Sequence, residues 1–154
     1  GGILDVSHAS DEATDDLLRL GRELGRPVVA SHSNARALAA HPRNLTDDQI
    51  RAIAASGGVV GVNFHQRFLA PSGRQASLDD VVEQVLHLIR VGGIGVVAIG
   101  SDYEGGIRAA RGLTNASLYP ELARALEARG LSHSDVKRAL GENALRVLCG
   151  SAAR

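Results

Sequence analysis

The sequence predicts an α/β fold of parallel βα units that form the second half of a (β/α)8 TIM-type barrel. Four short apolar runs, at residues 3–7, 27–31, 58–63 and 95–101, are each followed by a helical pattern. This alternation is typical of a parallel sheet. The runs are almost continuously apolar, which favours strands that are covered on both faces.

The first two helical segments are predicted from their ends. A helix is expected over residues 10–25, because acidic residues occupy its first turn and the sequence Gly-Arg-Pro follows its last turn. A short helix is expected from Asn34 to Ala40, before a turn that contains Pro42. Together they place one helix after the first strand and another after the second.

The later helices carry capping signals. Thr46 and Gln49 have the spacing of a capping box, and Ser77 starts a second helix in the same way. An apolar stripe in that second helix predicts that it covers the sheet; it consists of Leu78, Val81, Val82, Val85, Leu88 and Ile89. A last helical region is expected from Ser132, with a kink at Gly141.

The predicted architecture is one domain over residues 1–154 that is half of a barrel. A complete (β/α)8 barrel has about 250 residues, and four strands alone leave sheet edges unpaired. The chain begins within a predicted strand, so we expect it to be a piece of a larger chain. A half-barrel must otherwise pair with a separate N-terminal half or associate with itself as a homo-oligomer.

Composition excludes several classes of partner. Seventeen basic and seventeen acidic residues cancel without forming blocks, so no nucleic-acid or anionic membrane partner is expected. The longest weakly polar stretch, residues 91–100, is too short to be a membrane segment. The single cysteine, Cys149, excludes an internal disulfide, and we expect it to be buried. It slightly favours a reducing compartment, and we expect a cytoplasmic location.

Three potential metal ligands or proton carriers follow predicted strands. His8 and His32 each follow an apolar run directly, and Asp102 follows a third. The carboxyl ends of parallel strands form one rim, where barrel enzymes place their chemistry. Two imidazoles there would suit zinc, although a structural histidine is the alternative. Ser7 and Ser31 are expected to cap the following helices, with orientation of the imidazoles as the second possibility.

Two further side chains suit substrate chemistry. Asp102 lies between glycines and could accept a proton from a metal-bound water, although an Asx-turn explains it equally well. Arg43 lies on a predicted turn, where a guanidinium can bind a carboxylate with two hydrogen bonds, and a solvated arginine is the alternative. His41 and His65 are weaker candidates near the same rim.

An ordered set of motifs resembles the membrane (renal-type) dipeptidase family. The resemblance extends over essentially the whole chain, through the segments at residues 141–143 and 145–147, and corresponds to the C-terminal half of that family's barrel. The motifs are Asp5-Val6-Ser7-His8, Val29-Ala30-Ser31-His32-Ser33-Asn34-Ala35-Arg36, His41-Pro42-Arg43-Asn44-Leu45-Thr46-Asp47, Gly61-Val62-Asn63-Phe64 and Gly100-Ser101-Asp102-Tyr103-Glu104-Gly105.

The resemblance implies a binuclear zinc hydrolase, related to the amidohydrolases, in which a metal-bridging water attacks the amide bond of a dipeptide substrate. His8 and His32 match two ligands of the same Zn²⁺ in that family. Asp102 matches the aspartate that handles the proton of the water, and Arg43 matches the arginine that binds the substrate's terminal carboxylate. Two zinc ions would lower the pKa of water and polarise the carbonyl.

The chain also departs from the family's pattern. The family's first-half ligands, a His-x-Asp pair and a bridging glutamate, and its first-half substrate-binding histidine have no counterpart here. Two histidines leave a zinc ion without enough ligands, so we expect the chain to be inactive without its N-terminal half. The alternatives are a non-catalytic, self-assembling half-barrel scaffold and a related amidohydrolase that acts on another amide or on a lactam.

Overall fold

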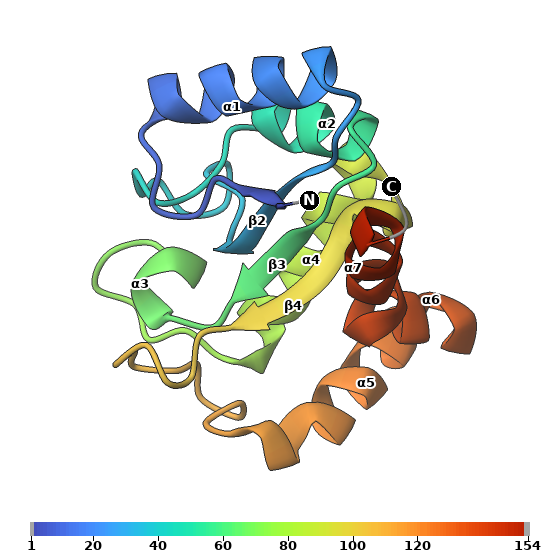
Figure 1. Cartoon of the computed structure of the whole chain (residues 1–154). Coiled ribbons are helices and arrows are strands. Elements are labelled where there is room, and N and C mark those ends of the chain that lie inside the picture. The colour runs from blue at the N-terminus through green and yellow to red at the C-terminus, as the bar shows by residue number, and fades with distance from the viewer. Residues whose placement is uncertain (1, 153–154) are drawn as a thin grey trace.

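The computed structural model describes residues 2–152, in which strands and helices alternate (Figure 1). The strands form one parallel sheet in the order β1-β2-β3-β4, which confirms the predicted parallel βα arrangement. In chain order the elements are β1 (Leu4–Asp5), α1 (Asp11–Glu23), β2 (Val28–Ser33), α2 (Asp47–Ala55), β3 (Val60–Asn63), α3 (Gln66–Leu69), α4 (Leu78–Gly92), the 3₁₀ turn η1 (Ile94–Val96), β4 (Val97–Ser101), the 3₁₀ turn η2 (Ala116–Leu118), α5 (Tyr119–Ala128), α6 (His133–Lys137), the π-helical turn η3 (Arg138–Glu142) and α7 (Asn143–Ala152).

The two faces of the sheet are covered by different helices. Val28 and Val60 point to the face where α1, α2 and α4 pack, and both are fully buried in the main core. Their neighbours Val29 and Val59 point to the opposite face, where Val147 of α7 packs on them. Figure 1 accordingly shows α4 behind the sheet and α7 in front of β4. Covering on both faces explains why the strands are apolar without alternation.

The helix starts follow the predicted capping chemistry. Ser10 caps α1 by accepting a hydrogen bond from the Ala13 backbone N–H, and Thr46 and Gln49 form the predicted capping box of α2. At the start of α4, the Asp80 carboxylate accepts from the Ser77 backbone N–H at 2.8 Å. Each cap satisfies an N–H that has no partner inside its helix.

The prediction of a short helix from Asn34 to Ala40 is wrong. This segment is a turn, because its backbone groups bond elsewhere: the Ala35 N–H donates to Gln84 Oε1 at 2.8 Å. The Arg36 N–H donates to the Leu45 carbonyl at 2.8 Å, so the segment pairs with the chain ahead of α2. A local alanine-rich pattern was outweighed by these tertiary hydrogen bonds.

Other differences lie after β3. The helices α3 and α5 were not predicted, and the expected kink at Gly141 is the π-helical turn η3. Cys149 is exposed on α7, so the expectation that it is buried is wrong. Within residues 2–152, no helix combines the length and the apolar character needed to cross a membrane.

Candidate metal centre

The carboxyl ends of the strands bring two predicted metal ligands into contact. His8 lies just after β1 and His32 lies near the end of β2, as the chain order predicts. Their Nε2 atoms are 3.0 Å apart and their ring centroids are 5.0 Å apart. Residues separated by 24 positions in the sequence therefore present two imidazole nitrogens to the same point on the rim.

The backbone at this rim adopts unusual conformations. Among the non-glycine residues of the described chain, only His8, Ser101 and Asp102 have positive φ angles, of 73°, 23° and 72°. L-amino acids rarely occupy this region, and its cost of about 1–3 kcal/mol is usually met where a side chain must point in a particular direction. Two of these three residues were predicted as site residues from their position alone.

A β-bulge sets the direction of the second strand end. Ala30 pairs with Val60 and Ser33 pairs with Val62, so β2 contains one residue more than β3 in this interval. The extra residue lies in the Ser31–His32 segment, and bulges of this kind redirect side chains next to active sites. Gly100 of β4 accommodates it, because a Cβ at that position would lie 2.1 Å from the Ser31 carbonyl oxygen.

Hydrogen bonds from the two strand ends hold His32. Asp5 Oδ1 accepts from the backbone N–H groups of Ser7 and Ser31, each at 3.0 Å. Ser7 Oγ accepts from the His32 N–H at 3.0 Å, and Ser31 Oγ lies 2.8 Å from His32 Nδ1. The two serines thus orient the histidine instead of capping helices, which corrects the preferred prediction for them. Burial raises the pKa of Asp5, but the hydrogen bonds from Ser31 and Ser7 outweigh it and lower the pKa overall.

The charge state of His32 suits a metal ligand. Burial lowers the pKa of His32, nearby Asp102 raises it in part, and Arg43 and His8 lower it further. The net lowering keeps the imidazole neutral at pH 7, and a metal binds only the neutral form of the ring. Nδ1 of His32 is hydrogen-bonded to Ser31 Oγ, and Nε2 is directed at His8. Metal binding at Nε2 requires Nδ1 to carry the proton and to donate to Ser31 Oγ.

The donor set fits a shared metal ion but does not complete its coordination. Two nitrogens about 2.0–2.1 Å from one tetrahedral zinc ion would lie about 3.3 Å apart, and the two Nε2 atoms are 3.0 Å apart. Within residues 2–152, no group of three or more His, Cys, Asp or Glu side chains is arranged to hold a metal. A zinc ion at His8 and His32 would therefore need further ligands from outside this set of residues.

Arg43 lies beside the rim with unsatisfied donors. Its Nε and Nη2 atoms are buried without a hydrogen-bond partner, and its guanidinium carbon lies 5.4 Å from the centre of the Phe68 ring. Burial lowers the pKa of Arg43, and Asp102 offsets part of that effect. Buried donors without partners are rare in proteins and are costly, so this guanidinium is suited to receive an anion.

Asp102 is half-buried at the end of β4. Its Oδ2 atom accepts a hydrogen bond from Asn63 Nδ2 at 3.0 Å. The carboxylate lies close enough to His32 and Arg43 to act on both electrostatically. The structure therefore gathers the four predicted site residues on one rim, with the two histidines in direct contact.

The other histidines have separate surroundings. His41 and His65 pack on Phe68, with ring centroids 4.5 Å and 4.7 Å from it, and His41 Nδ1 accepts from the Arg43 backbone N–H. His87 pairs with Asp47 at 2.7 Å between α4 and α2. Asp5 was missed as a supporting residue, although an aspartate inside an apolar strand was the available signal.

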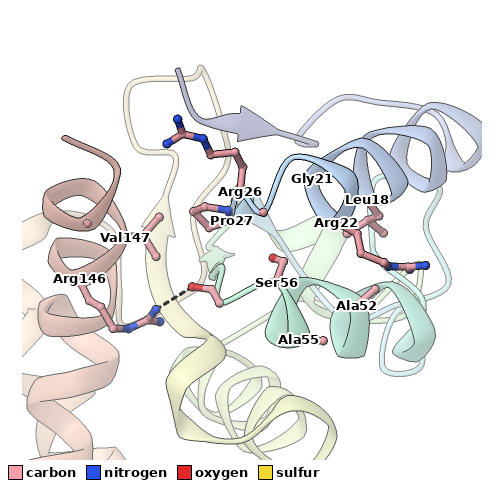
Figure 2. A pocket seen from close by; sticks show the side chains of 13 residues that line it. Leu18, Gly21, Arg22, Arg26, Pro27, Ala52, Ala55, Ser56, Arg146 and Val147 are labelled. Carbon is pink, nitrogen blue, oxygen red and sulfur yellow. Dashed lines mark hydrogen bonds between the residues drawn. The ribbon is translucent and has the colours of Figure 1, made fainter. Parts of the chain in front are cut away.

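A cavity lies at the end of the sheet opposite the rim, near the amino ends of β2 and β3 (Figure 2). It has a volume of about 630 Å³ between α1, α2 and α7. Arg146 donates from there to the carbonyls of Gly57 and Gly95, at 2.7 Å and 2.8 Å. The guanidinium groups of Arg22 and Arg26 extend away from Ser56 in Figure 2. These polar side chains do not converge on the cavity, so the rim is the stronger candidate site.

Comparison with known proteins agrees with this geometry. The model of the family Membrane dipeptidase (Peptidase family M19) matches residues 1–153. An uncharacterized Klebsiella pneumoniae protein in the pqqA 5′ region is 43% identical over 148 residues, which are 94% of this chain and 53% of that protein. The chain spans between 35% and 53% of the length of the first curated relatives that it matches.

Two crystal structures have the same fold. Dipeptidase AC, described as a metallopeptidase of family M19, superimposes with a TM-score of 0.86 and 35% identity over 94% of this chain and 43% of its own. A Rhodobacter sphaeroides metallopeptidase, liganded with a phosphinate mimic of the dipeptide L-Ala-D-Ala, gives a TM-score of 0.84 and 36% identity over 94% of this chain and 41% of its own. These likenesses confirm the predicted fold class.

Proposed function

The chain belongs to the membrane dipeptidase family, peptidase family M19, and from this premise we propose that it supplies the C-terminal half of a zinc-dependent dipeptidase. The observation that carries the proposal is the pair of imidazoles 3.0 Å apart beside an arginine with unpartnered buried donors. The pair suits a metal ligand set, and the arginine suits a substrate carboxylate.

In this proposal His8 and His32 hold one zinc ion, and ligands outside the 154 residues complete the centre. The first curated relatives are longer than this chain, and the family's first barrel half is the proposed source of those ligands. When bound, the metal would polarise the amide carbonyl and lower the pKa of water. Ser7 and Ser31 hold His32 in place, and Asp5 holds the backbone of both serines.

Arg43 is the proposed binding group for the C-terminal carboxylate of a dipeptide. Its Nε and Nη2 atoms lie on one edge of the guanidinium, which matches the two oxygens of a carboxylate. Substrate binding would satisfy donors that are otherwise buried without partners. This pairing places the scissile amide at a fixed distance from the carboxylate, which favours dipeptides over longer peptides.

Asp102 is the proposed proton carrier. Hydrolysis adds water across the amide: the new C–O bond forms, the C–N bond breaks, and the leaving amine needs a proton. Asp102 takes a proton from the attacking water and passes it to the amine nitrogen. Its half-buried position on the rim, close to His32 and Arg43, supports this role.

Dipeptide hydrolysis by the complete enzyme tests this function. We define the complete enzyme as this chain together with the residues that complete its metal site. It should hydrolyse L-Ala-L-Ala or L-Ala-D-Ala, lose activity when a chelator removes metal, and recover it with Zn²⁺. Hydrolysis that persists after complete metal removal, or hydrolysis of neither dipeptide by the zinc-loaded enzyme, would contradict the proposal.

Replacing Arg43 by glutamine should raise the KM for L-Ala-D-Ala by roughly 100-fold, with kcat changed only a few-fold. The variant loses charge-assisted hydrogen bonds to the carboxylate, which are worth about 3 kcal/mol together. Steady-state kinetics measure both constants. The same substitution at Arg22, which is exposed beside the cavity at the other end of the sheet, is the control. An unchanged KM in the Arg43 variant would show that the carboxylate binds elsewhere.

A further inference from the structure

A fully buried carboxamide lies directly behind the proposed proton carrier. Asn63 is the last residue of β3 and is 0% exposed. Its Oδ1 atom accepts from the His65 backbone N–H at 2.6 Å, and its Nδ2 atom donates to Asp102 Oδ2 at 3.0 Å. A backbone N–H can only donate, so it fixes the oxygen of the amide on its side and the NH₂ group toward Asp102.

The backbone of Asn63 is held as firmly as its side chain. Asn34, also 0% exposed, follows β2 and reaches both main-chain groups of Asn63. Its Nδ2 atom donates to the Asn63 carbonyl at 3.0 Å, and its Oδ1 atom accepts from the Asn63 N–H at 3.1 Å. Asn63 is also paired with Ser101 of β4, so its main chain is held from both sides and its side chain stays directed at Asp102.

This arrangement distinguishes the two oxygens of the Asp102 carboxylate. Oδ2 faces an NH₂ donor and must act as an acceptor, whereas no hydrogen bond within residues 2–152 reaches Oδ1. A Cβ at position 105 would lie 2.1 Å from Oδ1, so Gly105 leaves the space that this oxygen needs. A proton taken up by the carboxylate would therefore go to Oδ1.

We propose that Asn63 is the positioning residue for Asp102, holding Oδ2 so that Oδ1 alone exchanges the proton. This rests on the proposed function, in which Asp102 carries the proton of hydrolysis. Asn63 touches no substrate in this proposal and acts only through Asp102. Gly105 contributes by the absence of a side chain, because any Cβ there would displace the positioned oxygen.

The test uses Asn63→Asp in the complete enzyme. The new carboxyl keeps an acceptor for the His65 N–H but replaces the donor toward Asp102 by an acceptor, so the two carboxyl groups repel unless they share a proton. The kcat should fall roughly 100-fold, as expected for a misplaced catalytic group, with KM within about threefold. Asn115→Asp, which makes the same change at an exposed loop residue, should leave both constants within about twofold.

A double-mutant cycle separates positioning from a general structural role. In an enzyme that already carries Asp102→Asn, the Asn63→Asp change should cause no further loss of kcat, because it acts through a group that no longer takes a proton. An additional 100-fold loss in that background would overturn the proposal. If Asn63→Asp does not fold, Gly105→Ala decides, since it displaces the same oxygen from an exposed position and should also lower kcat without changing KM.

A spectroscopic readout keeps the result independent of activity. The side-chain amide resonances of Asn63 should shift in Asp102→Ala and stay in place in Arg43→Gln, because only the first removes the acceptor. If the Asn63 side-chain resonances do not shift in Asp102→Ala, the contact between Asn63 and Asp102 does not exist, and the proposal is overturned even if the enzyme is active. If the resonances shift but the enzyme does not hydrolyse dipeptides, the contact is present and the proposed function is wrong.

Discussion

Replacing Asp102 by asparagine should lower the kcat of the complete enzyme by about 10³-fold and leave KM within about threefold. The substitution keeps the shape of the side chain, and the new amide oxygen can still accept from Asn63 Nδ2. The NH₂ group would then occupy the position of Oδ1 and could not accept a proton. Substrate binding, which depends on Arg43 in our proposal, would be unaffected.

Steady-state kinetics with L-Ala-D-Ala measure this change. Asp79→Asn is the matched control, because Asp79 is exposed in the first turn of α4 and is not among the charges that act on His32 or Arg43. It should keep kcat within about twofold. An Asp102→Asn enzyme that retains more than a tenth of the wild-type kcat would contradict the proton-carrying role.

Replacing His32 by alanine should weaken zinc binding by more than about 100-fold and lower activity in proportion at limiting metal. Removal of a residue that only hydrogen-bonds to a metal ligand costs a metal site about 10–100-fold in affinity, and loss of the ligand itself costs more. His32 also links the two strand ends, through Ser7 and through its contact with His8. Competition with a chelator of known affinity measures the change.

The control for this variant is His133→Ala. The His133 side chain is 81% exposed on α6 and pairs with Glu127, so its removal should change neither zinc affinity nor kcat. Excess Zn²⁺ should restore part of the activity of His32→Ala if the loss is one of affinity. A variant with wild-type zinc affinity would exclude His32 as a ligand.

The rim could be predicted from the sequence because parallel topology gives strand ends a common location. Once His8 and His32 were placed directly after apolar runs, the alternation of strands and helices was enough to predict that they meet. The 3.0 Å separation of their Nε2 atoms agrees with that prediction. The roles of Asp102 and Arg43 required the family resemblance, because single residues on loops carry little local pattern.

Other features depend on tertiary contacts that leave no periodic signal. The positive φ angle of His8 belongs to the turn after β1, and the bulge at Ser31–His32 belongs to the pairing of β2 with β3. Asn63 is a buried amide in an otherwise apolar strand, and its contribution could be recognised only once its hydrogen bond to Asp102 was known. The failed helix over 34–40 has the same cause, since Gln84 of α4 takes the N–H of Ala35. In the segment 34–40, a side-chain to backbone hydrogen bond between distant parts of the chain outweighed local propensity.

The central claim is that His8 and His32 hold a metal ion of a dipeptidase centre, and elemental mass spectrometry of the complete enzyme tests it most directly. The account predicts about two zinc ions per chain in the wild type, as in two-metal hydrolases, and at most about one in the His8→Ala/His32→Ala double variant. Dipeptide hydrolysis should be lost with the missing ion. An equal zinc content in the two proteins would contradict the claim.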